Sequence, residues 1–256
     1  MDSSGINSSK GTQSLSIGLA KLLKPGTVIL NSPVRHVRQD STGVYVSSGR
    51  GDFNCRKVII SLPTPLYKEI TFEPPLSEAK RKFSSSTVLG YTNKVMLMYT
   101  SPWWRSANLC GIVQSFKGPI CVTRDSSVDN KKQFSLTCFL VGDLGRELSK
   151  QSKPQRHQAV ISHIKEIFSP FIDVPEPIAV AEHEWANDQW AQGCPCPATP
   201  PGVMSEFGHA LRSTHLNVHF VGTETAFKWK GYMDGAIESG ERGAAEIIES
   251  FKRAKL

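Results

Sequence analysis

The sequence has no long apolar run, few cysteines and no signal-like start. Among its 256 residues no stretch approaches the roughly 18 apolar residues that a membrane-spanning helix needs, so we expect no membrane span. Six cysteines are too few for a disulfide scaffold in a chain of this length. The first residues lack the basic and apolar segments of a secretory signal, and we therefore expect reduced thiols.

Three common chemical motifs are also absent. No Gly-x-Gly-x-x-Gly occurs, since the nearest fragment, Gly49–Gly51, has Asn54 in the last position and lies in a predicted hairpin. Gly-x-Ser-x-Gly is missing, which argues against a serine hydrolase. The run Cys194-Pro195-Cys196-Pro197 has neither a second cysteine pair nor a histidine at ligand spacing, so we predict no metal site.

The composition is that of a folded chain with a modest basic surplus. Hydrophobic residues make up 39% and charged residues 21%, and 30 Lys+Arg against 23 Asp+Glu give a net charge of +7. The densest basic clusters, Lys80–Lys82 and Lys252–Lys255, are not interleaved with aromatic residues. Solvated surface cations therefore explain the charge better than a nucleic-acid partner, and nucleic-acid binding is the least favoured alternative.

Apolar periodicity predicts an α/β chain with a strand-rich middle region. The first part contains an amphipathic helix over 15–23 and short strands, of which 57–63 has the continuous apolar run of a strand covered on both faces. The middle region, from about residue 84, alternates strands with polar turns and has one helix, which indicates an α+β block. Further strands are predicted at 28–30, from 34 onward, and at 44–46, 53–55, 94–99, 112–113, 120–122 and 134–141. The middle helix is predicted at 159–168.

The last third has the clearest pattern. A buried strand over 218–221 stops at Gly222, a polar loop follows at 223–225, and a helix runs over about 232–251. His219 lies in the apolar strand and is more consistent with a core histidine than with a ligand. The first turns of the helix are rich in Gly, Ala and Ser. Close helix–sheet packing and a flat ligand at the strand's carboxyl end explain these small residues about equally well.

The chain ends in Ala254-Lys255-Leu256, close to the Ser-Lys-Leu address that peroxisomal import receptors read. Basic residues just upstream keep such a tail solvated. We predict a peroxisomal location and recognition by the import receptor, and this prediction gains weight if the chain belongs to a peroxide-producing oxidase.

The segment HFVGTETAFKWKGYMDGA, residues 219–236, and its continuation over 237–245 resemble the C-terminal flavin-binding signature of the monoamine oxidase family. Within that family the fungal members look closest. The resemblance continues upstream and covers nearly all of residues 10–250. Its upstream motifs are Leu89–Lys94, Pro102-Trp103-Trp104, Glu184-Trp185 and Pro200-Pro201-Gly202.

The resemblance implies a partial FAD/NAD(P)-binding-type fold with an inserted α+β, mixed-sheet substrate domain. Residues 1–9 would be a disordered start. Residues 10–83 and 185–251 would form the FAD-binding part and 84–184 the substrate-binding part, followed by the targeting tail over 252–256.

It also implies site residues, position by position. Lys94 matches the lysine that holds a water near flavin N5, and burial of Lys94 would exclude a simple surface role. Trp185 matches a tryptophan packed near the flavin ring. Tyr232 matches one wall of the aromatic cage that orients the amine.

The cofactor implied is FAD, held by backbone and loop residues. The N–H of Met233, at a helix N-terminus, would face the flavin pyrimidine, where a helix N-terminus stabilises negative charge. Gly222, Thr223 and Glu224 would line the ribityl and pyrophosphate path. Val34 matches a backbone contact to the adenine.

Two departures from the family pattern bear on the cofactor. Cys194 falls where some members carry the cysteine bonded to flavin, but Pro195 replaces the usual cage tyrosine, which favours non-covalent FAD. The family's glycine-rich phosphate loop would precede residue 1, so we expect a partial chain, with a partner chain as one source of the N-terminal half.

The activity implied is oxidation of a primary or secondary amine to imine and aldehyde, with O2 reduced to hydrogen peroxide. Two alternatives stay open. One is a polyamine or L-amino-acid oxidase, whose acidic or arginine-lined pocket the sequence does not place. The other is a catalytically silent module that keeps the fold and serves in binding.

Overall fold

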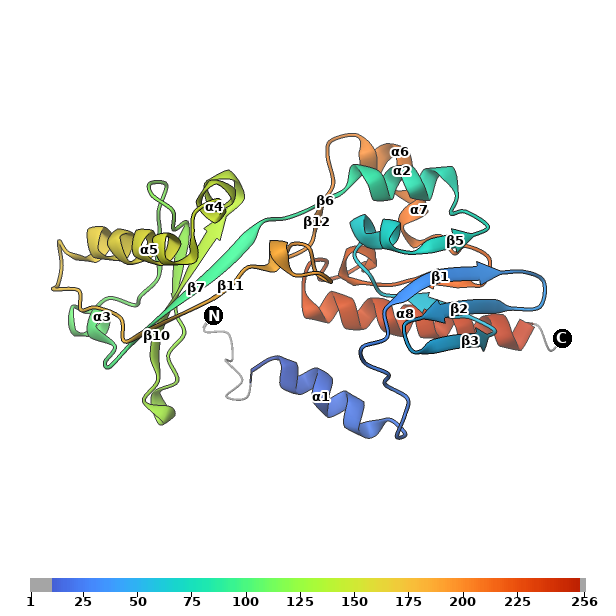
Figure 1. Ribbon diagram of the computed structural model, residues 1–256, viewed down its shortest axis with the longest axis horizontal. Helices are drawn as coiled ribbons and strands as arrows, with labels where there is room; N and C mark the ends of the chain where they lie inside the picture. Colours follow the sequence, from blue (N-terminus) through green and yellow to red (C-terminus); the bar gives the residue numbers. More distant parts are fainter. Residues whose placement is uncertain (1–10, 254–256) are drawn as a thin grey trace. The chain divides into compact units, whose positions relative to one another are not determined.

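The computed structural model describes residues 11–253, so the predicted disordered start and Ala254–Leu256 of the predicted tail lie outside the described residues. Contacts divide the chain into two compact units (Figure 1). Among the described residues, the split unit comprises 29–90 and 195–253, and the central unit comprises 91–194 together with 11–28. The predicted domain roles stay predictions.

The split unit is built on a four-stranded sheet in the order β3-β2-β1-β5. Strands β1 (Val34–Gln39), β2 (Val44–Ser48) and β3 (Gly51–Cys55) form an antiparallel meander, as the alternating pattern and the turn at Gly49 predict. Strand β5 (Thr71–Glu73) pairs parallel to β1. The interior of this unit contains Val37, Val44, Phe72 and Phe220.

A separate parallel pair in the split unit leads to the candidate site. Strand β13 (Val218–Phe220) pairs in parallel with β4 (Val58–Ile60), and every residue of β13 is buried. Shorter elements complete the unit. These are 3-10 helix η1 (Thr64–Glu69), α2 (Glu78–Ser86), β6 (Val88–Leu89) paired with β12 (Pro197–Ala198), α6 (Val203–Phe207), α7 (His209–Arg212), 3-10 helix η4 (Thr223–Thr225) and α8 (Met233–Arg253).

Two expectations of buried strands are wrong. Val28, Ile29 and Leu30 form no strand, and their side chains are 48%, 46% and 70% exposed. Strand β4 is shorter than the predicted 57–63, and Ile59 in its centre is 40% exposed. Within the described part of the chain β4 pairs only with β13. Because an apolar strand is buried only when neighbouring strands and helices cover it, these segments lie open in this chain.

The central unit is a five-stranded sheet in the order β11-β7-β10-β9-β8, with antiparallel neighbours. Its strands are β7 (Thr92–Tyr99), β8 (Val113–Gln114), β9 (Val122–Asp125), β10 (Phe134–Val141) and β11 (Ala179–His183). Its helices are α1 (Gln13–Leu22), α3 (Trp103–Ser106), α4 (Gly142–Ser149) and α5 (Lys153–Phe168), with 3-10 helices η2 (Asp129–Lys131) and η3 (Trp185–Asn187).

Packing in the central unit follows the apolar alternation of its long strands. Val160 and Ile164 of α5 are fully buried against a core that includes Leu97, Leu136 and Trp104. The helix predicted over 15–23 forms as α1, but none of its residues is buried. In the described range no helix is long and apolar enough to cross a membrane.

Lys80 is a buried cation that ties α2 to α7. The side chain is 2% exposed; its ammonium donates to the carbonyl oxygens of Ala210 and Leu211 and lies 3.9 Å from the centre of the Phe220 ring. These contacts satisfy carbonyls at the end of a short helix. Burial nevertheless lowers the pKa of Lys80 from 10.5 to about 8.

This lowered pKa predicts a pH-dependent stability. The folded state holds the Lys80 proton less tightly than the unfolded state, so the cost of the buried charge is full below pH 8 and is relieved as the pH rises toward 10.5. Relative to Lys80→Met, the wild type should gain about 2–3 kcal/mol in unfolding free energy over that range. Chemical denaturation at pH 7 to 10 measures it, and a difference that does not change with pH would contradict the prediction.

Candidate functional site

The carboxyl end of β13 turns sharply into η4 and is held against α8. Gly222 has φ of +127°, a conformation that L side chains rarely adopt. Its N–H donates to the Ser239 hydroxyl on α8 at 2.9 Å. A Cβ at Gly222 would lie 3.1 Å from Glu224 Oε2. Glycine is therefore needed here both for the turn and for the close approach of the Glu224 carboxyl.

Glu224 is a buried carboxyl group inside this turn. The residue is 6% exposed, and Oε1 accepts the backbone N–H of Thr64 at 2.8 Å. Burial raises the pKa of Glu224, and the hydrogen bonds from backbone N–H groups only partly oppose that effect. The carboxyl thus joins η4 to the segment that follows β4, so both strand ends of the parallel pair are fixed relative to each other.

Thr223 positions the start of α8. Its hydroxyl donates to the carbonyl of Tyr232 and accepts the N–H of Gly231, both at 2.8 Å. The side chains of Tyr232 and Met233 are 66% and 51% exposed. The backbone N–H groups of the first helical turn have no carbonyl ahead of them within the helix, so this exposed end suits a negatively charged or hydrogen-bond-accepting ligand.

Arg242 is a functional-site neighbour that the sequence reasoning did not single out. Its guanidinium donates to the carbonyl of Phe220 and the hydroxyl of Thr225, both at 2.9 Å, and to Glu246 at 2.6 Å. The other carboxylate oxygen of Glu246 lies 2.8 Å from Nδ1 of His219. The i,i+4 spacing of Arg242 and Glu246 was the available signal. His219 is the buried core histidine predicted, although its Nε2 has no hydrogen-bond partner among the described residues.

Close packing requires small side chains at several positions of α8. A Cβ on Gly243 would lie 2.5 Å from the Val221 side chain, and one on Gly235 would lie 2.3 Å from the carbonyl oxygen of Trp229. Ser239 is fully buried. Close packing thus explains these three positions, whereas a Cβ on Gly240 would meet no atom within 4 Å.

Val34, the predicted adenine contact, begins β1 in the split unit. It is half-buried and pairs with Ser48, and the register shifts between Val34 and His36. The hydroxyl groups of Ser32 and Ser48 hydrogen-bond at 2.8 Å beside it. The turn before β1 is therefore fixed, and the adenine contact stays a prediction.

Lys94 and Trp185 lie in the central unit. Lys94 is exposed on β7, with its ammonium 5.4 Å from the centre of the Phe139 ring. Lys94 is thus not buried in this chain, and a simple surface role for it is not excluded. Trp185 begins η3, is 39% exposed, and contacts His183 edge-on with ring centres 4.3 Å apart.

Cys194 is the last residue of the central unit. Its thiol donates to the carbonyl of Thr92 at 3.1 Å, and burial raises its pKa. A raised pKa keeps the sulfur protonated at neutral pH, which lowers its reactivity as a nucleophile. Gly193 before it has φ of +147°.

A buried ion cluster supports the strand that leads to Trp185. Arg156 on α5 donates two hydrogen bonds to Glu182 on β11, at 2.9 and 3.1 Å, and pairs with Glu184 at 3.3 Å. Asn93 donates to Glu182 at 2.8 Å, and Nε2 of His157 lies 3.1 Å from the other oxygen of this carboxylate. Sequence reasoning missed this cluster because its members lie far apart along the chain.

The candidate residues thus form two groups, one in each unit. Gly222, Thr223, Glu224, Tyr232 and Met233 lie on one strand–loop–helix segment, which a single signature in the sequence indicated. The split unit also holds Val34, whereas the central unit holds Lys94, Trp185 and Cys194. In the described residues no group of three His, Cys, Asp or Glu side chains is placed to hold a metal ion.

Comparison with known proteins connects this site to a family. Residues 2–248 match the family model of flavin containing amine oxidoreductases. Amine oxidase [flavin-containing] B of Canis lupus familiaris is 31% identical over 230 residues, which are 88% of this chain and 44% of that protein. A probable flavin-containing monoamine oxidase A of Dictyostelium discoideum is 28% identical over 247 residues, covering 96% of this chain and 54% of that protein.

Solved structures give the same result. A putrescine oxidase with bound putrescine has a TM-score of 0.87 at 25% identity, and the match covers 94% of this chain and 53% of that one. Cyclohexylamine oxidase from Brevibacterium oxydans has a TM-score of 0.88 at 27% identity, with the same coverage. The chain spans about half the length of the relatives it matches. It belongs to the flavin-containing amine oxidoreductase family, and its fold is the corresponding part of the FAD-binding fold.

Proposed function

We propose that this chain forms the C-terminal part of an FAD-dependent oxidase of primary or secondary amines. The observation that carries the proposal is the β13–η4–α8 segment, in which Gly222, Thr223 and Glu224 fix the exposed start of a long helix. The matching relatives are named as monoamine, putrescine and cyclohexylamine oxidases, which supports an amine as the substrate class.

The residues present fit one side of FAD. Gly222 allows the turn that brings the Glu224 carboxyl close to the backbone, and the first turn of α8 offers backbone N–H donors beside the exposed Met233. A helix N-terminus of this kind suits the flavin pyrimidine oxygens, and Glu224 with Thr223 would line the ribityl path. The glycine-rich motif that would hold the pyrophosphate is absent from the sequence, so the fit is partial.

Bound FAD would supply the acceptor for a hydride from the carbon next to the amine nitrogen; with loss of an N–H proton the amine becomes an imine, O2 takes up the electron pair and two protons as hydrogen peroxide, and water converts the imine to an aldehyde and ammonia or an amine. The chain's own residues would orient and enclose the reactants. Tyr232 would form one aromatic wall for the neutral amine, and Trp185 would pack near the flavin ring. Lys94 would hold a water at the site of oxygen reduction. Cys194, protonated and hydrogen-bonded, favours non-covalent FAD.

The complete site needs a second polypeptide segment, and we propose a glycine-rich βαβ unit in that role. The apolar side chains of Val28–Leu30 and Ile59 are exposed, and β4 is paired on one side alone in the described part of the chain. A parallel strand beside β4, with the helix of the same βαβ unit, would cover Ile59. The alternative, a catalytically silent module, has the same exposed residues but binds no flavin.

Flavin titration distinguishes these functions. The purified chain is titrated with FAD, alone and after co-expression with the N-terminal half of a related monoamine oxidase, and the flavin band at about 450 nm is recorded. The proposal predicts a bound flavin in the co-expressed sample, bleaching on addition of benzylamine without oxygen, and peroxide with oxygen. A soluble complex of the two halves that binds no flavin would favour the silent module.

Lys94→Met should slow the reoxidation of reduced flavin by O2 by about tenfold or more, because the positioned water near the reacting flavin would be lost. Flavin reduction by amine should change little. Stopped-flow measurement of the two half-reactions tests the assignment, with Lys117→Met, another exposed lysine of the central unit, as the matched control. Equal oxygen reactivity in Lys94→Met and wild type would remove the proposed role.

We also propose that the C-terminal Ala-Lys-Leu directs the protein to peroxisomes through the import receptor. A fluorescent protein fused ahead of the chain should co-localise with a peroxisomal marker, and deletion of Leu256 should disperse it. A fusion that stays dispersed with the tail intact would contradict the proposal.

A further inference from the structure

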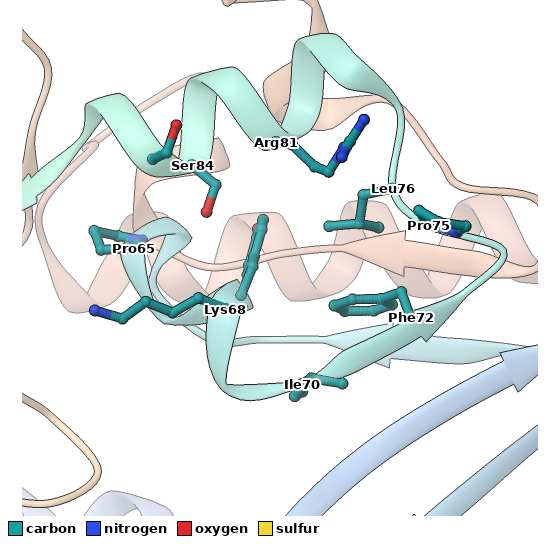
Figure 2. Close-up of a pocket in the computed structure, with 10 residues that line it drawn as sticks. Pro65, Lys68, Ile70, Phe72, Pro75, Leu76, Arg81 and Ser84 are labelled. Atoms are coloured by element: carbon teal, nitrogen blue, oxygen red, sulfur yellow. The ribbon is translucent and has the colours of Figure 1, made fainter.

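A pocket lies in the split unit, lined by residues outside the β13–η4–α8 segment (Figure 2). It has a volume of about 300 Å³ and is formed by η1, β5, α2 and the turn between β5 and α2. None of its lining residues belongs to β13, η4 or α8. Its lining residues are Pro65, Tyr67, Lys68, Ile70, Phe72, Pro75, Leu76, Arg81, Ser84 and Ser85.

The walls of this pocket are apolar. Tyr67, Ile70, Phe72 and Leu76 each have less than a tenth of their surface exposed. Figure 2 shows Ile70, Phe72 and Leu76 on one side of the pocket, facing the helix that carries Arg81 and Ser84. A concave, mostly apolar site with a few polar groups is the form that small-molecule pockets take.

The polar groups of the pocket have one charge sign. Lys68 and Arg81 are exposed side chains at its edge, none of the ten lining residues is acidic, and neither cation forms an ion pair among the described residues. The nearby carboxylate of Glu78 is paired with Lys82 at 3.0 Å, and the hydrogen bond and charge of Lys82, together with the charge of Arg81, lower its pKa. The pocket therefore combines an apolar interior with a cationic rim.

The hydroxyl groups on α2 add hydrogen-bonding capacity. Ser84 donates to the carbonyl of Thr64 at 2.7 Å, and Ser85 donates to the carbonyl of Lys82 at 3.1 Å. Each hydroxyl has thus used its proton and can still accept a hydrogen bond, but it is not positioned as a donor for an anion. The cations at the rim are the groups that would recognise a negative charge.

We propose that this pocket binds a small amphipathic carboxylate, with its apolar chain or ring between Phe72 and Leu76 and its carboxylate at Arg81 on the facing helix. Figure 2 shows Lys68 at the opposite end of the pocket. Its volume of about 300 Å³ is at the lower end of the range for small-molecule pockets, so it suits a small ligand. A medium-chain fatty acid or an aryl-alkyl carboxylic acid has this size and polarity. The site is independent of flavin and goes beyond the proposed oxidase activity.

Octanoate is the probe, and octan-1-ol is its uncharged match. Titration of the purified chain is followed by calorimetry and by the methyl NMR signals of Ile70 and Leu76. We expect saturable octanoate binding that shifts these two signals and leaves the methyl signal of Ile112, an exposed residue of the central unit, in place. The alcohol should bind more weakly.

A charge-removal variant tests the rim. Lys68→Gln/Arg81→Gln removes both cations of the rim and should weaken octanoate binding about two- to fivefold, the effect of losing one exposed ion pair, and leave octan-1-ol binding unchanged. Arg50→Gln/Lys117→Gln removes two exposed cations outside the pocket and should leave octanoate binding unchanged. Four results would each overturn the proposal: no saturable binding, no shift at Ile70 and Leu76, equal binding of acid and alcohol, or equal weakening in the two double variants.

Discussion

Replacement of Arg156 by Met is expected to lower the unfolding free energy of the central unit by about 3 kcal/mol at pH 7, because it removes the guanidinium from a buried carboxylate and leaves Asn93 and His157 beside it. The Glu182 side chain is 2% exposed and the Arg156 side chain 11%. Burial alone would raise the pKa of Glu182, but the bonds from Arg156 and Asn93 outweigh it, and the pKa is lowered. The fluorescence of Trp103 and Trp104 during urea unfolding reports on this unit.

The pH dependence of the Arg156–Glu182 pair has a definite sign. Because the folded state holds the Glu182 carboxyl below its ordinary pKa of 4.5, the pair stabilises the fold above that pH. The contribution is lost as the pH falls through the lowered value. The stability difference between wild type and Arg156→Met should therefore shrink in acid.

Two controls separate the buried pair from a general loss of charge. Arg156→Met/Glu182→Met removes both partners and should recover part of the loss, since apolar side chains replace the pair while the buried Asn93 amide and His157 lose their acceptor. Arg253→Met breaks an i,i+4 pair with Glu249 whose side chains are 78% and 53% exposed, and should cost about 0.5 kcal/mol or less. Comparable losses in Arg156→Met and Arg253→Met would contradict the assigned role.

The sequence predicted those helices, strands and turns that depend on a pattern within a short stretch of the chain. Strand β13, the turn at Gly222 and helix α8 follow from an apolar run, a glycine and a 3.6-residue period, and all three are present. The Arg156–Glu182 pair has no such signal, because it joins a helix and a strand 26 residues apart. Its formation depends on the packing of α5 on the sheet, which periodicity does not specify.

The exposed apolar segments show where prediction from a local pattern fails. Val28–Leu30 and Ile59 have the apolar character of buried strands, but burial depends on neighbours that pattern alone does not supply. The candidate site likewise has a part that the sequence predicted and a part that it did not. The signature over 219–236 located the loop and the helix start, whereas the hydrogen bonds of Arg242 that brace them became visible only in three dimensions.

The small residues of α8 give the sharpest remaining test, since the sequence treats them alike and the structure does not. Gly235→Ala should cost about 2–4 kcal/mol or displace the preceding loop, because the new Cβ would lie 2.3 Å from the carbonyl oxygen of Trp229 and 3.0 Å from that of Lys228. Backbone atoms cannot rotate away as side chains can. The start of α8, where Tyr232 and Met233 lie, would move with the loop.

Gly240→Ala is the matched variant on the same helix and should have the opposite sign. Its Cβ meets no atom within 4 Å, and its backbone is helical, so alanine should raise the unfolding free energy by about 0.5–1 kcal/mol through the higher helix propensity of alanine. Urea unfolding of both variants, with Trp229 fluorescence as a reporter of the loop, measures the pair. Equal effects of the two substitutions would show that helix propensity, rather than contact with the 228–229 carbonyls, governs this face of the helix.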